Sequence, residues 1–273
     1  MTGASQGIGE ATARRYHEAG ATVVIADLKE AESAVIADDL NGQGPDSARA
    51  VGIDVTDTAA AEKLVASVIE DFGGVDVLVA NAGVFPFAPI ADMDADMLRT
   101  VFDINVVGVH NFLRPVTKHM VESGRKGKIV ITLSIDALHP SAPGLGAYDT
   151  SKHALYGYMR MAALEYAEAS IMINGLAPGG ILTPGVTGGA DTTELIENSG
   201  VPVGRWGEYA WGAGARRVRP GDRPTSIRRQ HRRGADARRR DAAAPGRALA
   251  SLTARHFPPT RPMRSVAVHS TRG

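Results

Sequence analysis

Cysteine is absent from this 273-residue chain, and none of its apolar runs is long. The absence of cysteine excludes disulfide scaffolds, cysteine metal ligands and a cysteine nucleophile. No apolar run approaches the roughly 18 residues that a membrane-spanning helix needs, and no basic-then-apolar signal segment opens the chain. The eight histidines are scattered without metal-ligand spacing. We therefore expect a cytoplasmic protein without a metal site, in which 44% hydrophobic residues build the core.

The formal net charge of zero hides two oppositely charged segments. Residues 1–200 carry 13 basic and 26 acidic side chains, a net charge of −13, and residues 201–273 carry 17 basic and 4 acidic side chains, a net charge of +13. All 17 basic residues of the second segment are arginines. Such a tail has enough charge to bind nucleic-acid phosphates. It lacks interleaved aromatic residues and helical spacing of its charges, so we do not expect nucleic acid as a partner.

Residues 7–182 alternate between helical and strand patterns. The apolar spacing predicts helices over residues 8–19, 30–40, 58–72, 93–123 and 147–169. Short apolar β-branched runs predict strands at 21–26, 50–53, 75–80, 128–133 and 171–176. Pro115 should kink or divide the long fourth helix. Strands that alternate with helices indicate an α/β fold, a doubly wound parallel sheet with helices on both faces.

A glycine-rich loop opens the chain, with glycines at Gly3, Gly7 and Gly9. Glycine allows the backbone to turn tightly and approach a pyrophosphate, and the helix that follows would direct free N–H groups at it. The spacing differs from the G-x-G-x-x-G fingerprint, so an ordinary turn remains an alternative. Asp27 ends the next predicted strand, where a carboxylate can accept both ribose hydroxyls of an adenosine. Capping of the following helix is the other role open to Asp27.

Tyr148 and Lys152 are four residues apart on one predicted helix and therefore share a face. A cation about 4 Å from the phenol would bring the tyrosine pKa from ~10 to near ~7, where acid–base catalysis is efficient. Ser134 follows a predicted strand, where its hydroxyl would be displayed to a carbonyl oxygen. Taken alone, a Tyr-x-x-x-Lys pair is more often a solvated helix face.

In combination, these motifs resemble the short-chain dehydrogenase/reductase family, and the likeness covers about residues 1–208. The resemblance implies a doubly wound fold and a nicotinamide cofactor. The residues that it places at the cofactor are Gly3, Ser5, Gly7, Ile8, Gly9, Asp27, Asp54, Val55, Asn81, Ala82, Gly83, Tyr148, Lys152, Pro178, Gly179 and Thr183. Asp54 corresponds to the adenine contact, and the segment from Pro178 to Thr183 corresponds to the nicotinamide contact.

The same resemblance implies a catalytic tetrad of Asn105, Ser134, Tyr148 and Lys152. In the family pattern Tyr148 exchanges a proton with the substrate oxygen, while Lys152 lowers the Tyr148 pKa and holds the nicotinamide ribose. Ser134 orients the substrate oxygen, and Asn105 holds a relay water near the lysine. The separation of 14 residues between Ser134 and Tyr148 is one more than the pattern leads us to expect. Ser141 is a rival, but it lies in the middle of a loop.

The implied activity is hydride transfer between NAD(H) and a secondary alcohol or its ketone, as in alcohol dehydrogenases and 3-oxoacyl-carrier-protein reductases. Asp27 favours NAD, because a carboxylate repels the 2′-phosphate of NADP. The implied partners are a small-molecule substrate and further copies of the chain, in a dimer or homotetramer. There are two alternatives to this function. The chain is an inactive remnant of such an enzyme, or it binds nucleic acid through its arginine tail. The sequence does not name the substrate, and residues 184–200 are expected to form its lid.

The resemblance is incomplete at both ends. A strand should precede the glycine loop, yet Gly3 is the third residue, so we expect the natural start to lie upstream. After Glu208 the family pattern stops, and residues 209–273 are expected to be a disordered tail. Read one base later with suitable codons, residues 229–235 give Gly-Asn-Thr-Val-Val-Val, close to the family's last strand. We therefore expect a frameshift between about residues 208 and 215, which leaves residues 1–208 as an incomplete NAD-binding domain without its first and last strands.

Overall fold

The computed structural model describes residues 1–43, 47–188 and 206–208, all within one compact unit of residues 1–216. The predicted arginine-rich tail and most of the predicted lid lie outside the described residues. The elements are α1 (Gly7–Glu18), β1 (Val23–Asp27), α2 (Glu30–Asn41), β2 (Ala48–Gly52), α3 (Thr58–Phe72), β3 (Val77–Ala80), α4 (Ala95–Phe102), η1 (Asp103–Val107), α5 (Gly108–Glu122), β4 (Lys128–Thr132), η2 (Ile135–Ala137), α6 (Gly146–Glu165), β5 (Met172–Leu176), β6 (Ile181–Leu182), α7 (Pro184–Thr187) and β7 (Gly207–Glu208). None of these helices is both long enough and apolar enough to cross a membrane.

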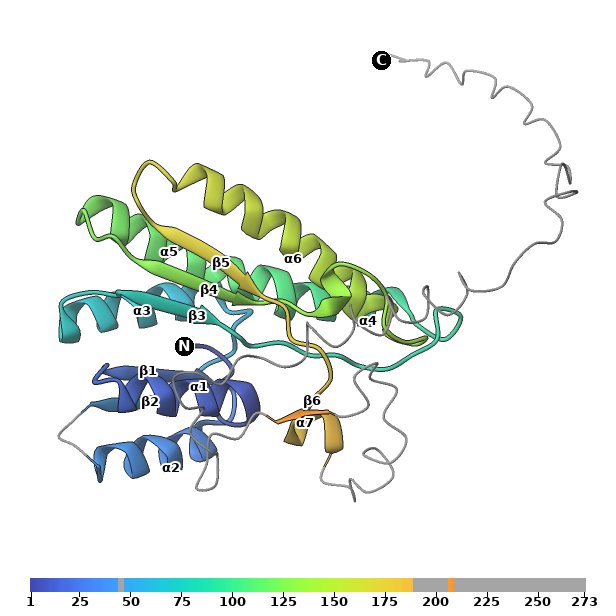
Figure 1. The fold of residues 1–273 in the computed structure, drawn as a ribbon, viewed down its shortest axis with the longest axis horizontal. Helices are drawn as coiled ribbons and strands as arrows, with labels where there is room; N and C mark the ends of the chain where they lie inside the picture. The colour runs from blue at the N-terminus through green and yellow to red at the C-terminus, as the bar shows by residue number, and fades with distance from the viewer. Residues whose placement is uncertain (44–46, 189–205, 209–273) are drawn as a thin grey trace, which may run out of the picture. The chain divides into compact units, whose positions relative to one another are not determined.

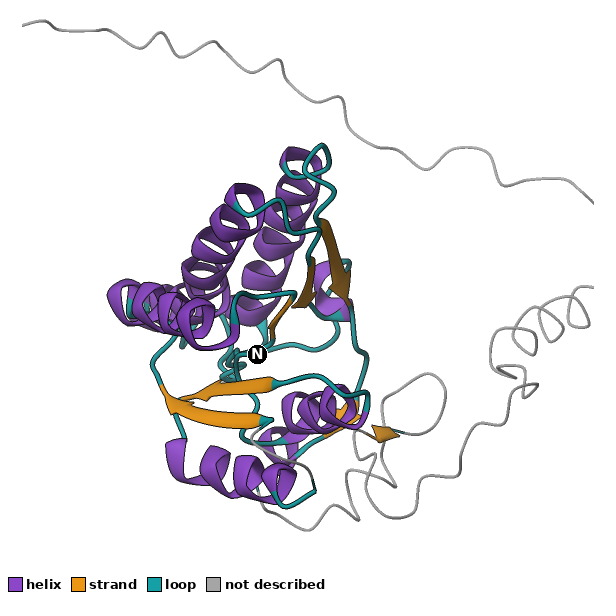
Figure 2. Cartoon of the chain, turned by 90° about the vertical axis from the view of Figure 1, so that its left-hand side faces the viewer, coloured by secondary structure: helices purple, strands orange, loops and turns teal. Residues whose placement is uncertain are grey.

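Five parallel strands form two groups that meet at the N-terminus (Figures 1 and 2). β1 pairs with β2, and β4 pairs with both β3 and β5. Thr2 connects the groups, because it forms single parallel bridges to Ala26 of β1 and Ala80 of β3. The resulting order is β2, β1, Thr2, β3, β4, β5, so successive strands run outward in both directions from Thr2, as a doubly wound sheet requires.

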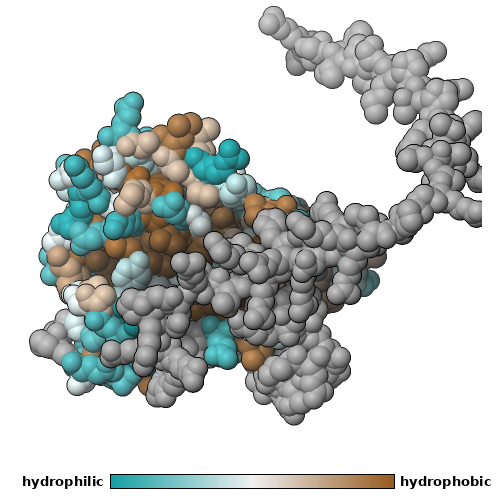
Figure 3. Space-filling view, in the orientation of Figure 1, coloured by the Kyte–Doolittle hydropathy of each residue, from teal (hydrophilic) through white to brown (hydrophobic). Residues whose placement is uncertain are grey.

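Helices cover both faces of this sheet. α3, α5 and α6 lie on one side, and α1 and α2 lie on the other (Figure 2). The main core includes Ile129 and Ile131 of β4, both fully buried, and Leu155 of α6. Figure 3 shows apolar side chains exposed over the strands on the viewed face, and Met172 and Leu176 of β5 are among the exposed apolar residues.

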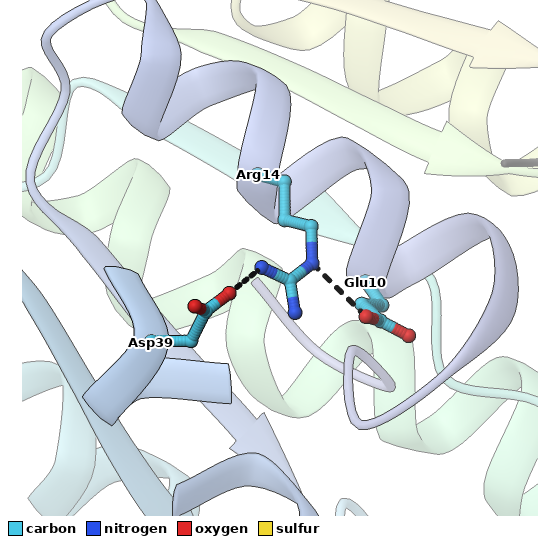
Figure 4. Close-up of polar contacts among 3 residues, drawn as sticks. All are labelled: Glu10, Arg14 and Asp39. Atoms are coloured by element: carbon cyan, nitrogen blue, oxygen red, sulfur yellow. Dashed lines mark hydrogen bonds and ion pairs between the residues drawn. The ribbon is translucent and has the colours of Figure 1, made fainter. Parts of the chain in front are cut away.

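Arg14 connects α1 and α2, the two helices that lie on the other side of the sheet from α3, α5 and α6. Its guanidinium donates to Glu10 of α1 at 3.0 Å and to Asp39 of α2 (Figure 4). The hydrogen bond and the charge of Arg14 lower the pKa of the Asp39 carboxyl. All three side chains are partly exposed, so the network orients α1 against α2 more than it stabilises the fold.

Protein atoms fill only part of the space between β1 and β3. Met1 lies in it, and its ammonium group donates to the carbonyl oxygen of Val24 at 2.9 Å. Burial lowers the pKa of this ammonium group to about 6. Beyond Met1 the two strands border a cavity of about 430 Å³, whose lining includes Val24, Val77 and Val79.

The predicted helix 93–123 is wrong as a single element. It consists of α4, a π-helical turn at η1 and α5, and Pro115 lies inside α5 without dividing it. The interruption occurs instead at the turn that carries the buried Asn105, whose side chain bonds to the backbone of Val84. π-Helical turns of this kind are frequent at functional sites. The other predicted helices and strands are present, with ends that shift by four residues or fewer.

Candidate active site

The glycine loop forms a tight cradle before α1. Gly3 and Gly7 have φ angles of +64° and +61°, which side chains disfavour. A Cβ on Gly9 would lie 2.1 Å from the carbonyl oxygen of Gly3, so only glycine fits there. The side chain of Gln6, at the N-cap of α1, makes no capping hydrogen bond. The first turn of α1, which includes Ile8, therefore offers backbone N–H groups and a positive dipole end to an anion.

Asp27 supports this loop from the end of β1. Its carboxylate accepts from the backbone N–H of Ser5 and from that of Lys29, both at 3.0 Å. Lys29, and not Asp27, is the N-cap residue of α2, so the helix-cap alternative does not apply. The Lys29 ammonium donates to the side chain of Gln6 at 3.4 Å. The predicted carboxylate thus lies beside the predicted phosphate loop.

Asn81 ties the loop to the rest of the sheet. Its amide nitrogen donates to the carbonyl oxygen of Gly3 at 2.6 Å, and its amide oxygen accepts from the Thr132 hydroxyl at 3.1 Å. The Thr2 hydroxyl accepts from the backbone N–H groups of Asn81 and Ala82. Local sequence patterns do not reveal these roles of Thr2 and Thr132, because the bonds link residues about 50 to 80 positions apart.

The nicotinamide-side segment reaches the same loop. Thr183 lies 3.4 Å from the position of a Cβ on Gly7. The carbonyl oxygen of Pro178 accepts from the N–H of Ile135, and Gly179 lies beside the same residue. These contacts place the predicted segment between the glycine loop and the residues that follow β4.

Asp54 and Val55 follow β2 and lie in a turn. The exposed carboxylate of Asp54 accepts from the N–H and hydroxyl of Thr56, at 2.9 and 2.8 Å. Val55 is buried, and its carbonyl oxygen accepts from Asn111 of α5. The hydrogen bonds found within the described residues do not join Asp54 to the glycine loop.

Asn105 is the buried residue of the π-helical turn η1. It is fully buried, and its amide nitrogen donates to the carbonyl oxygen of Val84 and to the Ser151 hydroxyl, at 2.9 and 3.0 Å. Its amide oxygen accepts from the Val84 N–H at 2.8 Å. The side chain of Asn105 thus fixes the backbone of the segment after Gly83, and both its amide nitrogen and its amide oxygen form hydrogen bonds within the protein.

Ser134 and Tyr148 meet where β4 ends and α6 begins. Ser134 is the buried N-cap residue of η2, whereas its rival Ser141 is exposed in the following loop. Burial raises the pKa of Tyr148 above its ordinary value of 10.0, and a hydrogen bond with Ser134 acts in the opposite direction but more weakly. The rings of Phe85 and Tyr148 pack in a T-shaped arrangement at a centroid distance of 5.9 Å.

Lys152 lies one turn after Tyr148 and is 3% exposed. Its ammonium group donates to the carbonyl oxygen of Thr132 at 2.7 Å and lies 5.5 Å from the centroid of the Tyr148 ring. Burial lowers the Lys152 pKa to about 8. The expectation that Lys152 brings the Tyr148 pKa to near neutrality is not met in this structure, in which burial of the phenol raises that pKa.

The buried lysine predicts a pH-dependent stability. An unfolded lysine keeps its proton up to a pH of about 10.4, whereas Lys152 in the folded chain loses it near pH 8. The unfolded state therefore binds more protons in this window, and folding becomes more favourable as the pH rises through it. Relative to Lys152→Met, the free energy of unfolding of the parent chain should gain about 3 kcal/mol between pH 7 and 10.5.

Urea unfolding of both chains across this pH range measures that gain. Lys118→Met is the matched control, because Lys118 is 72% exposed and paired only at the surface with Glu122. The difference in free energy of unfolding between Lys118→Met and the parent chain should stay nearly constant with pH. A constant difference for Lys152→Met as well would contradict the burial of the Lys152 ammonium group.

Comparison with known proteins connects this geometry to characterised relatives. The sequence model of the family described as short chain dehydrogenase matches residues 1–193. The chain is 38% identical over 211 residues to a glucose 1-dehydrogenase of Gluconobacter oxydans, covering 76% of this chain and 79% of the relative. It is 37% identical over 179 residues to a galactitol 2-dehydrogenase of Agrobacterium fabrum, covering 66% and 68%.

Solved structures share the architecture. A short-chain type dehydrogenase/reductase from Mycobacterium marinum superposes with a TM-score of 0.72 and 32% identity, covering 77% of this chain and 82% of the other. A 3-ketoacyl-(acyl-carrier-protein) reductase from Brucella melitensis, complexed with NADH, gives a TM-score of 0.67 and 29% identity over 76% and 84% of the two chains. These likenesses confirm the predicted doubly wound fold.

Proposed function

Because this chain belongs to the short-chain dehydrogenase family, we propose that it is a NAD-dependent oxidoreductase acting on a secondary alcohol or its ketone. The observation that carries the proposal is the convergence of Ser134, Tyr148 and Lys152 at the end of β4. These three groups can bind and protonate an oxygen. Hydrogen bonds through Asn81 and Thr132 connect Lys152 to a glycine loop that can hold a dinucleotide.

In this proposal the nicotinamide, when bound, supplies or accepts the hydride. Tyr148 gives its phenolic proton to the substrate oxygen during reduction and takes it back during oxidation. The raised pKa of Tyr148 keeps the phenol protonated at neutral pH, which suits the donating step. The Lys152 ammonium group stabilises the tyrosinate as its charge develops. The Ser134 hydroxyl orients the substrate oxygen.

The residues of the loop fit a dinucleotide. The cradle excludes a Cβ at Gly9, and the start of α1 lacks a side-chain cap, so backbone N–H groups are left for a pyrophosphate. Asp27 stands beside the loop as a hydrogen-bond acceptor for ribose hydroxyls. Its charge disfavours a 2′-phosphate, and Lys29 is partly engaged with Gln6. We therefore propose NAD as the cofactor.

Substitution of Asp27 by asparagine tests this preference. The amide keeps an oxygen that can accept from Ser5 but loses the negative charge. Because hydrogen bonds to charged groups contribute about 1.5–3 kcal/mol, the preference for NAD over NADP in kcat/KM should fall roughly tenfold or more. Steady-state kinetics with both cofactors measures this ratio.

Asp38→Asn provides the control, because Asp38 is an exposed carboxylate on α2 outside the loop contacts. Its cofactor preference should match that of the parent chain. An unchanged ratio in Asp27→Asn, or equal efficiency of the parent chain with NAD and NADP, would contradict the assignment of Asp27.

The names of the relatives guide the search for a substrate. Relatives of this chain are called glucose and galactitol dehydrogenases, so sugars and sugar alcohols form the first panel. The decisive experiment follows NADH formation with this panel and NADH consumption with the matching ketones. Binding of NAD without turnover of any compound in either panel would support the inactive-remnant alternative.

A further inference from the structure

Residues 84–91, which we call the apolar segment, lie shortly after β3 and contain no polar side chain. Two of the six phenylalanines of the chain are in this segment. Its large side chains Phe85, Phe87 and Ile90 are all exposed, although each is apolar. Exposed apolar side chains that gather in one place mark a surface that a ligand or a partner covers. The apolar segment therefore requires an occupant.

Buried polar contacts hold the apolar segment in place. The Asn105 side chain bonds to both the N–H and the carbonyl oxygen of Val84, at 2.8 and 2.9 Å. The N–H of Ala88 donates to the carbonyl oxygen of Gly144 at 2.9 Å, and prolines occupy two positions of the segment and restrict its backbone. A surface that is already ordered loses little entropy when a ligand binds to it.

Phe85 connects the apolar segment to the candidate catalytic groups. Its ring packs on that of Tyr148, and a Cβ on Gly185 of α7 would lie 3.5 Å from its Cζ atom. Tyr148 in turn forms a hydrogen bond with Ser134. Ligands of open α/β sheets bind outside the carboxyl ends of the strands, which is where the residues after β3 and β4 lie. Phe85 thus contacts the proposed proton donor and remains 41% exposed.

Phe87 and Ile90 extend this apolar surface along the loop that leads into α6. A Cβ on Gly144 would lie 2.4 Å from Cζ of Phe87, so the phenylalanine ring rests on the glycine backbone. A Cβ on Gly146, the first residue of α6, would lie 3.5 Å from Cγ1 of Ile90. The exposed side chains therefore border the same turn that carries Tyr148, and the site offers an apolar surface next to its reacting hydroxyl.

We propose that Phe85 determines substrate specificity, and that the chain acts on ketones and secondary alcohols whose alkyl or aryl group packs on this ring. The proposal rests on the proposed function of Tyr148 and narrows its substrate class. A hydroxylated group placed against Phe85 would lose water without gaining a hydrogen bond from the ring, whereas an alkyl group loses no hydrogen bond. Apolar ketones should therefore be better substrates than the sugars to which the names of the relatives lead.

A series of methyl ketones from 2-butanone to 2-heptanone, reduced with NADH, tests this wall. Each methylene that the wall covers should raise kcat/KM about fourfold, so three methylenes give a gain of roughly sixtyfold. 2-Hexanone should be a better substrate than fructose, a ketose with the same number of carbons. The gain across the series should fall to below about tenfold in Phe85→Ala and persist largely in Phe85→Leu, which keeps an apolar side chain.

The gain across the series cancels any general effect of Phe85 on the Tyr148 ring. Phe72→Ala is the matched control, because Phe72 is 42% exposed and lies at the end of α3 beside Arg49. Its gain should equal that of the parent chain. If Phe85→Ala slows every ketone by the same factor, Phe85 only supports the Tyr148 ring and the proposal fails. A flat series, with weaker association of copies of Phe85→Ala in sedimentation, would overturn it in favour of an interface.

Fluorine NMR of the chain labelled with fluorophenylalanine gives a readout that does not need turnover. The Phe85 resonance, assigned by its loss in Phe85→Leu, should shift when 2-heptanone is added in the presence of NAD, while the Phe72 resonance should stay in place. If Phe85 shifts but no ketone is reduced, the proposed activity fails and the apolar site stands. Turnover with a flat series and no shift of Phe85 leaves the activity standing and overturns the apolar wall.

Discussion

Replacing Tyr148 by phenylalanine should reduce kcat by roughly a hundredfold to ten-thousandfold, the contribution of a positioned general acid or base. Phenylalanine keeps the ring that packs on Phe85 and lies near the Lys152 ammonium group. It removes only the hydroxyl that exchanges the proton. The dissociation constant for NAD should therefore change little. Stopped-flow or steady-state kinetics and calorimetric NAD binding measure the two quantities separately.

Tyr156→Phe is the matched control for this substitution. Tyr156 lies on the same helix, is likewise half-buried, and packs against the core while its ring faces the guanidinium of Arg160. Removal of its hydroxyl should leave kcat near the parent value. Near-parent turnover in Tyr148→Phe would refute the assignment of Tyr148 as the proton donor.

Replacing Gly9 by alanine should abolish most cofactor binding. The added Cβ would lie 2.1 Å from the Gly3 carbonyl oxygen, 2.7 Å from Cα of Ala4 and 2.8 Å from the amide nitrogen of Asn81. Backbone atoms cannot yield easily, so the loop must move. Overpacking of this kind costs about 1–3 kcal/mol, which corresponds to a roughly tenfold to hundredfold weaker NAD complex if the loop geometry carries the loss.

Gly157→Ala is the control, because it inserts the same methyl group into open space. A Cβ on Gly157 meets no atom within 4 Å, and the residue lies in the interior of α6. This change should raise the free energy of unfolding by roughly 0.5–1 kcal/mol through helix propensity and leave NAD binding unchanged. Unaltered NAD affinity in Gly9→Ala would contradict the role of this loop as the dinucleotide cradle.

Local patterns explain why much of the architecture could be predicted. The helix predicted over 58–72 matches α3, because Asp57 caps its first turn and Gly73 ends it with a φ of +75°. Tyr148 and Lys152 share a face because four residues span about one helical turn. Ser134 lies at the end of β4, as its place after an apolar run predicts. Each of these features depends on residues close together in the chain.

The π-helical turn, by contrast, depends on contacts that no local pattern contains. Asn105 bonds to Val84, 21 residues earlier, and to Ser151, 46 residues later. Helical periodicity continues across Asn105, so the sequence predicts no break there and places a kink or division of the helix at Pro115 instead. The buried amide of Asn105 instead gains its partners where the turn widens.

The sequence by itself determined the α/β alternation, the glycine loop and the identity of the groups at the site. The tertiary structure decided how those groups behave. Burial raises the pKa of Tyr148 and lowers that of Lys152 to about 8, and the turn after β4 places the Asp136 carboxylate against the Ser134 hydroxyl. A side chain's protonation depends on its distance from water and from other charges. Those distances are set by packing between segments that are far apart in the chain. Residue types and their local spacing therefore do not predict them.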